Sequence, residues 1–247
     1  MFALLRAHQR TKPKTRMKTH LTKALLLVAV ALTVPTLAVA ALINGSFEEP
    51  FVASNLNFTG AFSFNGWSAF STGTGGDGNA GIVFGTDYGL TPFDGNQHFS
   101  FNGGNPPPGS YIEQTFSTVP GVSYTVAFGI GRNSAFLDPQ QSLAALELIS
   151  QVFNQTGDLL NFLPAQPSVS IAYTPTSFSF VANSATSRLR FTDVSASNPN
   201  TDLFIDSVSV VPEPTAALLT IFGLVIVATH RSRLRRPPQS LLGSLAA

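Results

Sequence analysis

The chain has 247 residues, 44% of them hydrophobic, which is enough for one domain with a substantial core plus terminal segments. It has no cysteine, which excludes a disulfide framework, a thiolate nucleophile and a cysteine-ligated zinc site. The formal net charge of +1 hides a segregation, because residues 41–211 hold three arginines, no lysine and twelve acidic residues. The resulting charge of −9 would repel a phosphate backbone, so we expect no nucleic-acid partner.

The first 40 residues have the three parts of a secretory signal peptide. A basic region is followed by an apolar stretch at 24–34, and Ala38 and Ala40 then form a small-x-small cleavage site. The apolar stretch is shorter than the roughly 20 residues of a bilayer span, which favours cleavage after Ala40 over an uncleaved anchor. The basic region is long if Met1 is the start, and Met17 would begin a signal peptide of ordinary length.

The C-terminal segment begins with Pro212, Glu213 and Pro214, directly after the last strand-like pattern. Two prolines in three residues interrupt a strand, and an apolar transmembrane helix is predicted over 215–230. Four arginines follow the helix: Arg231, Arg233, Arg235 and Arg236. The apolar part, 216–229, would be about 21 Å long against a hydrocarbon core of about 30 Å, which disfavours a permanent anchor. The arginines would stay cytoplasmic, so the preceding domain faces outward.

This order of a Pro-Glu-Pro triplet, a short apolar helix and an arginine-rich end resembles the PEP-CTERM sorting signal, over residues 212–236. The resemblance implies that an exosortase recognises the tail in the inner membrane and processes it near the triplet. It also implies export to the cell surface or the extracellular space of a bacterium that makes exopolysaccharide. Residues 237–247, a predicted cytoplasmic tail, depart from the family pattern, and an ordinary single-span anchor is the alternative interpretation.

The exported domain, 41–211, is predicted to be all-β. Short runs alternate apolar and polar residues, as at 188–191, where two arginines alternate with a leucine and a phenylalanine. A period of two with one apolar face is typical of half-buried antiparallel strands, and roughly ten such runs suit a sandwich. The stretch 143–153 could be a helix, but we interpret it as a strand because 156–158 has the residues of a hairpin turn.

Five short segments, in this order, resemble the galactose-binding-like jelly roll of bacterial carbohydrate-binding modules: Leu42–Glu48, Gly66–Trp67, Asp94–Gln97, Ile112–Phe116 and Leu203–Val210. The resemblance covers nearly the whole domain and implies an antiparallel jelly-roll β-sandwich without implying catalysis. It also implies a structural calcium ion between Glu48, after the first strand, and Asp206, on the last strand. Backbone carbonyls would supply the other oxygen ligands. The alternative is that both are solvated or edge carboxylates.

A sugar site in such a sandwich combines a flat aromatic face with hydrogen-bonding side chains. Tyr88 and Tyr111 flank predicted loops and are the candidate aromatic residues, with Asn96 and Gln97 as polar partners. Trp67 follows a glycine at a position where we expect it to be buried in the core. These residues predict a binding site at the loop ends of the sandwich.

The domain contains a single histidine, His98, and none of the sequence motifs of a serine hydrolase or a zinc protease. We therefore interpret His98 as a satisfied surface or strand histidine. The leading hypothesis is a non-catalytic, exosortase-sorted surface or extracellular-matrix protein that binds exopolysaccharide. The alternatives are an extracellular carbohydrate-active hydrolase and a structural biofilm protein with no small ligand.

Overall fold

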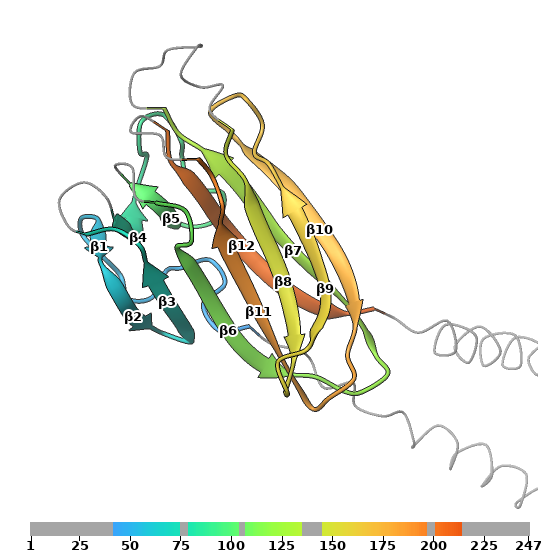
Figure 1. Cartoon of the computed structure of the whole chain (residues 1–247). Helices are drawn as coiled ribbons and strands as arrows, with labels where there is room; N and C mark the ends of the chain where they lie inside the picture. Colours follow the sequence, from blue (N-terminus) through green and yellow to red (C-terminus); the bar gives the residue numbers. More distant parts are fainter. Residues whose placement is uncertain (1–41, 75–78, 104–106, 135–144, 197–200, 214–247) are drawn as a thin grey trace, which may run out of the picture. The chain divides into compact units, whose positions relative to one another are not determined.

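The computed structural model describes residues 42–74, 79–103, 107–134, 145–196 and 201–213 (Figure 1). Over these residues the chain forms two antiparallel sheets of six strands each. The strands, in chain order, are β1 Leu56–Phe58, β2 Gly60–Phe64, β3 Trp67–Ser71, β4 Asn79–Phe84, β5 Gln97–Gly103, β6 Tyr111–Ser117, β7 Ser123–Arg132, β8 Leu148–Asn154, β9 Leu159–Ala165, β10 Tyr173–Val181, β11 Thr186–Asp193 and β12 Leu203–Pro212.

The described part of the chain includes no helix that is both long and apolar enough to span a bilayer. The predicted signal peptide, the predicted helix at 215–230, its arginines and the tail at 237–247 lie outside the described residues. Their assignment therefore stays a prediction from the sequence.

The strand order identifies the fold. The first sheet runs β1-β4-β5-β12-β7-β10 and the second runs β2-β3-β6-β11-β8-β9. The last eight strands form nested antiparallel pairs, β8 with β9, β7 with β10, β6 with β11 and β5 with β12, and successive pairs alternate between the two sheets. One long hairpin wound in this way is a jelly roll, which confirms the predicted fold class. The first four strands widen both sheets along one edge.

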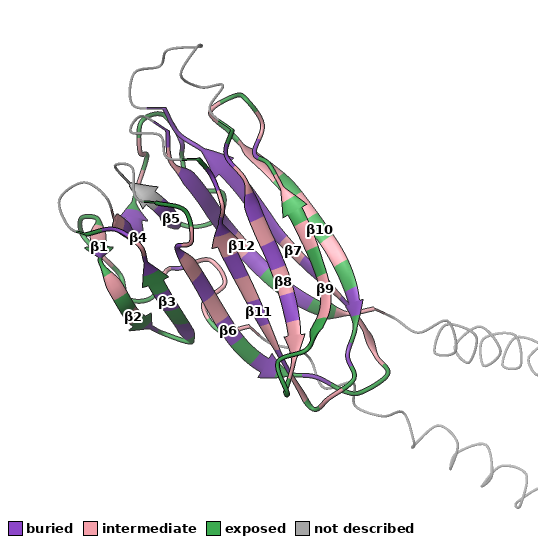
Figure 2. Cartoon of the chain, viewed as in Figure 1, coloured by how far each residue is buried: buried purple, intermediate pink, exposed green. Residues whose placement is uncertain are grey.

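The core lies between the sheets and contains many aromatic side chains. Buried and more exposed residues alternate along β6, β8 and β11 (Figure 2), as a period of two requires when one face is covered. Phe47 is fully buried, with its ring 5.5 Å from that of Trp67 and 5.7 Å from that of Phe99. Trp67 itself is only 2% exposed and donates from Nε1 to the carbonyl of Asn44, so its predicted core position is confirmed.

The β8–β9 hairpin confirms the preference for a strand over a helix in the stretch 143–153, as far as that stretch is described. Gly157 adopts a φ of 92° at the turn, a conformation that glycine reaches without a steric penalty. The Asn154 side chain accepts hydrogen bonds from the backbone N–H groups of Thr156 and Asp158 and closes the turn. A local polar residue thus determines the register of this hairpin.

A second, smaller apolar cluster covers the outer face of the first sheet. The loop between β4 and β5 folds back so that Leu90 packs with Val83 and Phe204. Gly129 and Gly131 of β7 leave room on this face, because a Cβ atom at either position would approach the Phe93 or Tyr173 ring to 2.8 Å. The protein itself therefore covers the part of this outer face around Val83, Gly129 and Phe204.

Strand β12 extends further than the sequence indicated. Pro212 is the last residue of the strand and pairs with Tyr124 of β7, so the sheet includes the first residue of the predicted sorting motif. The two prolines had suggested that the strand ends earlier. Proline is tolerated here because β5 pairs with β12 only at Phe204 and Ile205, which leaves one side of the Pro212 backbone without a strand neighbour.

The segment that precedes β1 is fixed against both sheets. Gly45 accepts a 2.8 Å hydrogen bond from the Val208 backbone N–H of β12, and the Gln114 side chain of β6 exchanges two hydrogen bonds with the Ile43 backbone. A Cβ atom at residue 45 would overlap the Val208 carbonyl oxygen. Only glycine therefore permits this close approach.

We expect Gly45→Ala to lower the free energy of unfolding by about 3 kcal/mol or more, because the added methyl group meets backbone atoms that cannot rotate away. Chemical denaturation measures the change. Ser46→Ala is the matched control, since it removes only one exposed hydrogen bond to Asp94 and should cost about 1 kcal/mol or less. Equal stability of Gly45→Ala and the wild type would contradict the described contact.

Candidate functional site

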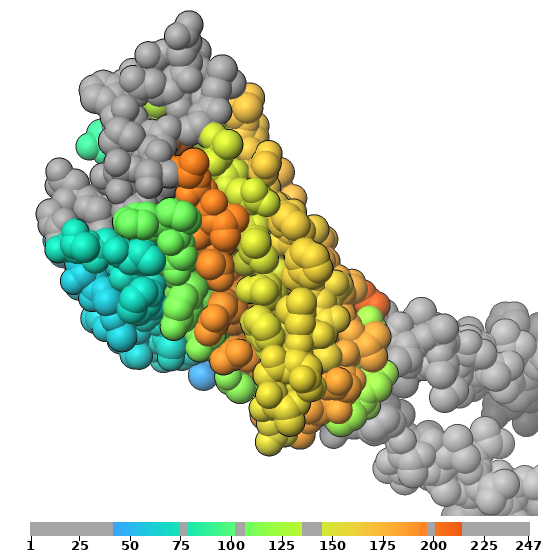
Figure 3. All heavy atoms as spheres, in the orientation of Figure 1, coloured from blue at the N-terminus to red at the C-terminus, as the bar shows by residue number. Residues whose placement is uncertain are grey.

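The two outer faces of the sandwich differ in what covers them. The loop 85–96 and Tyr173 lie on the first sheet, whereas β6, β11 and the β8–β9 hairpin of the second sheet run side by side at the surface in Figure 3, in green, orange and yellow. Outward-pointing side chains of the second sheet are therefore open to solvent. This face is the candidate functional site.

An aromatic strip crosses this face; we define it as Phe70, Tyr111, Glu113, Arg190, Arg188 and Phe153. The rings of Phe70 and Tyr111 stack at a centroid distance of 5.8 Å, and Phe70 is 37% exposed. The guanidinium of Arg190 lies 4.2 Å from the Tyr111 ring centroid. Cation–π contacts and stacking of this kind hold the rings in one orientation.

Glu113 forms ion pairs with both arginines of the strip and a hydrogen bond with Arg190. Its Oε2 atom lies 2.6 Å from Arg190 Nη2 and 3.5 Å from Arg188 Nε. The Arg188 guanidinium also lies 4.9 Å from the Phe153 ring centroid. All three charged side chains are partly exposed, so this network orients the arginines and adds little to stability.

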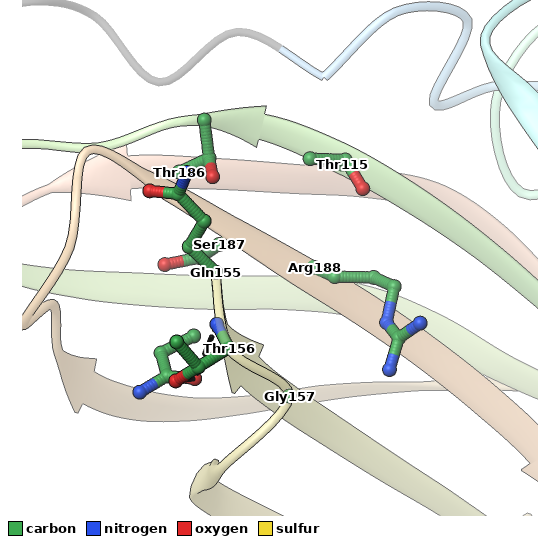
Figure 4. Close-up of a pocket in the computed structure, with 8 residues that line it drawn as sticks. Thr115, Gln155, Thr156, Gly157, Thr186, Ser187 and Arg188 are labelled. Carbon is green, nitrogen blue, oxygen red and sulfur yellow. Dashed lines mark hydrogen bonds between the residues drawn. The ribbon is translucent and has the colours of Figure 1, made fainter.

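A pocket of about 410 Å³ opens at one end of the strip. Its lining combines hydroxyl, amide and guanidinium groups from β6, β11 and the β8–β9 turn: Thr115, Asn154, Gln155, Thr156, Gly157, Thr186, Ser187 and Arg188. In Figure 4, Thr115 and Arg188 lie on the strands and the Gln155–Gly157 turn lies across from Thr115. The pocket is thus rich in hydrogen-bonding groups and continuous with the strip through Arg188.

The strip and the pocket together provide two kinds of contact. The exposed parts of the Phe70 and Tyr111 rings offer apolar surface, and the arginines, Glu113 and the pocket threonines offer donors and acceptors. Gln151 of β8 and Phe162 of β9 extend the row, since Gln151 pairs with both Arg190 and Phe162 and Phe162 is 52% exposed. A ligand with alternating apolar and hydroxyl surface matches this combination.

The predicted ligand residues are not brought together. Tyr111 lies on the aromatic strip, whereas Tyr88 and Asn96 belong to the loop on the outer side of the first sheet, where Tyr88 is 57% exposed. The prediction that Gln97 contacts a ligand is wrong, because its side chain is fully buried. Its side chain accepts from the Val52 N–H at 2.6 Å and donates to the Phe47 carbonyl at 2.6 Å, so it serves the backbone and is closed to a ligand.

The sequence interpretation missed the arginines of the strip, although the signal was present. Arg188 and Arg190 are two of the three basic residues of the exported domain, and both occupy outward positions of a clearly alternating strand. Their pairing with Glu113 depends on the register between β6 and β11, which the sequence does not show. The scarcity of basic residues in the domain could have indicated that the two arginines are candidate site residues. Their pairing with Glu113 could be assigned only from the fold.

Glu48 and Asp206, the predicted calcium ligands, act on the same loop. Glu48 Oε1 accepts hydrogen bonds from the Asn96 and Gln97 N–H groups at 2.7 and 2.8 Å. Asp206 Oδ2 accepts from the Phe93 and Asp94 N–H groups at 2.8 and 3.0 Å, and its Oδ1 accepts from the Ser207 N–H at 2.6 Å. The two carboxylates therefore satisfy the backbone amides of the loop that covers the first sheet.

This geometry fits a calcium ion poorly, because amide N–H groups point at the oxygens a cation would need. No group of three or more histidine, aspartate or glutamate side chains in the described ranges is arranged to hold a metal. A pocket of about 430 Å³ does bring Glu48 near Glu49, Asn44 and Asn65. Calcium binding by Glu48 and Asp206 stays a prediction of the resemblance.

His98 differs from the surface histidine that was one expectation. It lies in β5, fully buried, with Nδ1 2.7 Å from the Tyr173 hydroxyl and its ring 4.5 Å from the Phe204 ring centroid. Burial lowers the pKa of His98 to about 4, so the ring is neutral at physiological pH. Its described contacts are with Tyr173 of β10 and Phe204 of β12, and its Nε2 atom is buried without a hydrogen-bond partner among the described residues.

Comparison with known proteins finds similarity only among solved structures, since no family model and no curated protein matches the sequence. The carbohydrate-binding module TmCBM61 in complex with β-1,4-galactotriose is 11% identical over 69% of this chain and 96% of its own, with a TM-score of 0.43. A structure described as "CBM4 structure and function" is 13% identical over 70% of this chain and all of its own, with a TM-score of 0.38.

A putative sugar-binding protein from Bacteroides thetaiotaomicron is 9% identical over 70% of this chain and all of its own, with a TM-score of 0.42. At these identities and TM-scores the likenesses identify neither a family nor a ligand for this chain. The strand order is what identifies the jelly roll.

Two buried groups predict opposite pH dependences of stability. The unfolded chain protonates its histidine near pH 6.5, but native His98 resists protonation down to about pH 4, so acidification between these values favours unfolding. Burial, opposed by three backbone hydrogen bonds and aided by the Asp94 charge, raises the pKa of Asp206 from 3.8 to about 7. The stability that protonated Asp206 contributes is fully present below pH 3.8 and is lost progressively as pH rises from 3.8 to about 7.

We therefore expect the stability advantage of the wild type over His98→Asn to shrink by up to about 3 kcal/mol as pH falls from 6.5 to 4. The advantage over Asp206→Asn should instead shrink as pH rises from 3.8 to about 7. Thermal unfolding at constant ionic strength measures both differences in stability. Titrating groups that the wild type and the variant share contribute equally to both proteins, so their contribution cancels in the difference. Parallel pH profiles for the wild type and either variant would contradict the corresponding assignment.

Glu48→Gln is expected to lower the melting temperature in chelator, because a neutral amide accepts the Asn96 and Gln97 N–H groups more weakly than a carboxylate does. The calcium prediction requires a further result. Added calcium must raise the melting temperature of the wild type and leave that of Glu48→Gln unchanged. An identical wild-type melting temperature in calcium and in chelator would contradict calcium binding.

Proposed function

We propose that this chain is an exported, non-catalytic surface or matrix protein that binds extracellular polysaccharide along the aromatic strip of its second sheet. The observation that carries the proposal is the stacked Phe70–Tyr111–Arg190 platform, exposed at the surface and held by Glu113. A sugar ring has apolar C–H faces and a hydroxyl rim, and this platform offers a partner for each.

Preorganisation supports binding at this face. The Tyr111 ring lies between the Phe70 ring and the Arg190 guanidinium, and the same guanidinium is paired with Glu113. Side chains that are already ordered lose less conformational entropy when a ligand binds. The platform therefore has a rigidity that an isolated exposed tyrosine such as Tyr88 lacks.

The dimensions of the face favour an oligosaccharide or polymer over a single sugar. The strip crosses four neighbouring strands, β3, β6, β11 and β8, which at about 4.8 Å between strands span about 14 Å. The pocket at Arg188 continues the contact surface beyond the strip. An extended glycan chain lying across the strands would contact both.

The proposed export route and location rest on the sequence. The signal peptide at 1–40 would direct export, and the tail at 212–236 would hold the chain in the inner membrane until an exosortase processes it. The domain would then reach the cell surface or the extracellular space, where exopolysaccharide is available. Detection of intact Arg236 on the mature protein by mass spectrometry would count against this route.

Binding is tested with the full-length chain in detergent micelles, titrated against the producing cell's own polysaccharide and a panel of neutral and acidic glycans. We expect Tyr111→Ala to weaken binding by about tenfold or more, because it removes the central ring of the platform. Tyr88→Asn is the matched control: it deletes an exposed tyrosine outside the strip, and asparagine tolerates the φ of 40° at that position.

Binding that survives Tyr111→Ala and is lost in Tyr88→Asn would move the site to the loop on the first sheet. Absence of binding to every glycan would contradict the proposal and favour a structural matrix role. Release of reducing ends from a glycan by the purified wild type would favour the hydrolase alternative instead.

A further inference from the structure

Glu213, the middle residue of the Pro-Glu-Pro triplet, is bound by the folded domain. Its Oε1 atom accepts hydrogen bonds from the Thr125 and Ser179 hydroxyls, each at 2.7 Å. Its Oε2 atom accepts a third from the Ser123 hydroxyl at 2.8 Å. Three hydroxyl donors on one carboxylate favour a negatively charged side chain at this position.

The three hydroxyls come from adjacent strands on one face of the first sheet. Ser123 and Thr125 are two residues apart on β7, so they point to the same side, and Ser179 of β10 pairs directly with Thr125. The Thr125 and Ser179 hydroxyl oxygens are 3.1 Å apart, which lets both reach the same oxygen of Glu213. These bonds lower the pKa of the Glu213 carboxyl, which favours its charged form.

The backbone around Glu213 is held as well. The Glu213 N–H donates to the Ser123 carbonyl at 2.8 Å, and Pro212 stands in register with Tyr124. Two residues of the triplet therefore continue the β12–β7 ladder. An enzyme that reads the triplet as an extended segment must first separate this end of β12 from β7.

We propose that Ser123, Thr125 and Ser179 form a carboxylate-binding site whose occupant is the chain's own Glu213, and that this site withholds the triplet from processing once the domain has folded. The binding site itself stands on the contacts above, and its effect on processing rests on the sorting route of the proposed function. Processing then occurs before the domain folds or through local opening of the end of β12.

Hydrogen exchange measures the binding site directly. In the full-length chain in detergent micelles, we expect Thr125→Val combined with Ser179→Ala to speed exchange in the segment 207–213 by roughly tenfold. Ser177→Ala is the matched control, because Ser177 lies on the same face of β10 but does not bind Glu213. Unchanged exchange in the double variant, with global stability unaltered, would overturn the carboxylate-binding site.

A pulse-chase experiment in the producing cell measures the consequence. The double variant should lose its C-terminal tail faster than the wild type and Ser177→Ala. Equal processing rates despite faster exchange would overturn the control of processing. Absence of processing in all three chains would contradict the sorting route alone, because the exchange experiment decides on the binding site independently.

Discussion

Burial of one aromatic-rich layer between two sheets is the constraint on which the rest of the structure depends. Phe47, Trp67 and Phe99 pack together in this layer, and β6, β8 and β11 contribute every second side chain to it. Most inward-pointing side chains are apolar, because they fill the core. Functional polar residues are therefore confined to outward positions, to loops and to the ends of strands. The aromatic strip, the loop 85–96 and the Glu213 site occupy these three kinds of place.

The two outer faces use charge in different ways. On the first sheet, the charged carboxylate of Glu213 accepts three hydroxyl groups of β7 and β10, so its negative charge is bound by the protein itself. On the second sheet, Arg188 and Arg190 share the single carboxylate of Glu113 and remain partly exposed. In a domain whose net charge is strongly negative, this local balance of two cations against one anion distinguishes the open face.

Local sequence patterns predicted much of the fold, whereas pairing between strands distant in the sequence determined the candidate site. Alternation predicted the strands, and a turn sequence correctly assigned the β8–β9 hairpin, because both depend on neighbours in the chain. Gln97 was misassigned, since an amide next to a loop can point outward or, as here, into the backbone of residues 47–52. The link between Arg190 and Glu113, like the pairing of Pro212 with Tyr124, joins segments distant in sequence, and no local pattern encodes such a register.

The proposed function requires a glycan to bind on the open face of the second sheet. Hydrogen-exchange footprinting of the full-length chain, with and without a bound polysaccharide, tests it without any substitution. We expect slower exchange in β6 and β11, over 111–117 and 186–193, and no change in the loop 85–96. Protection confined to the loop 85–96, with β6 and β11 unaffected, would contradict it.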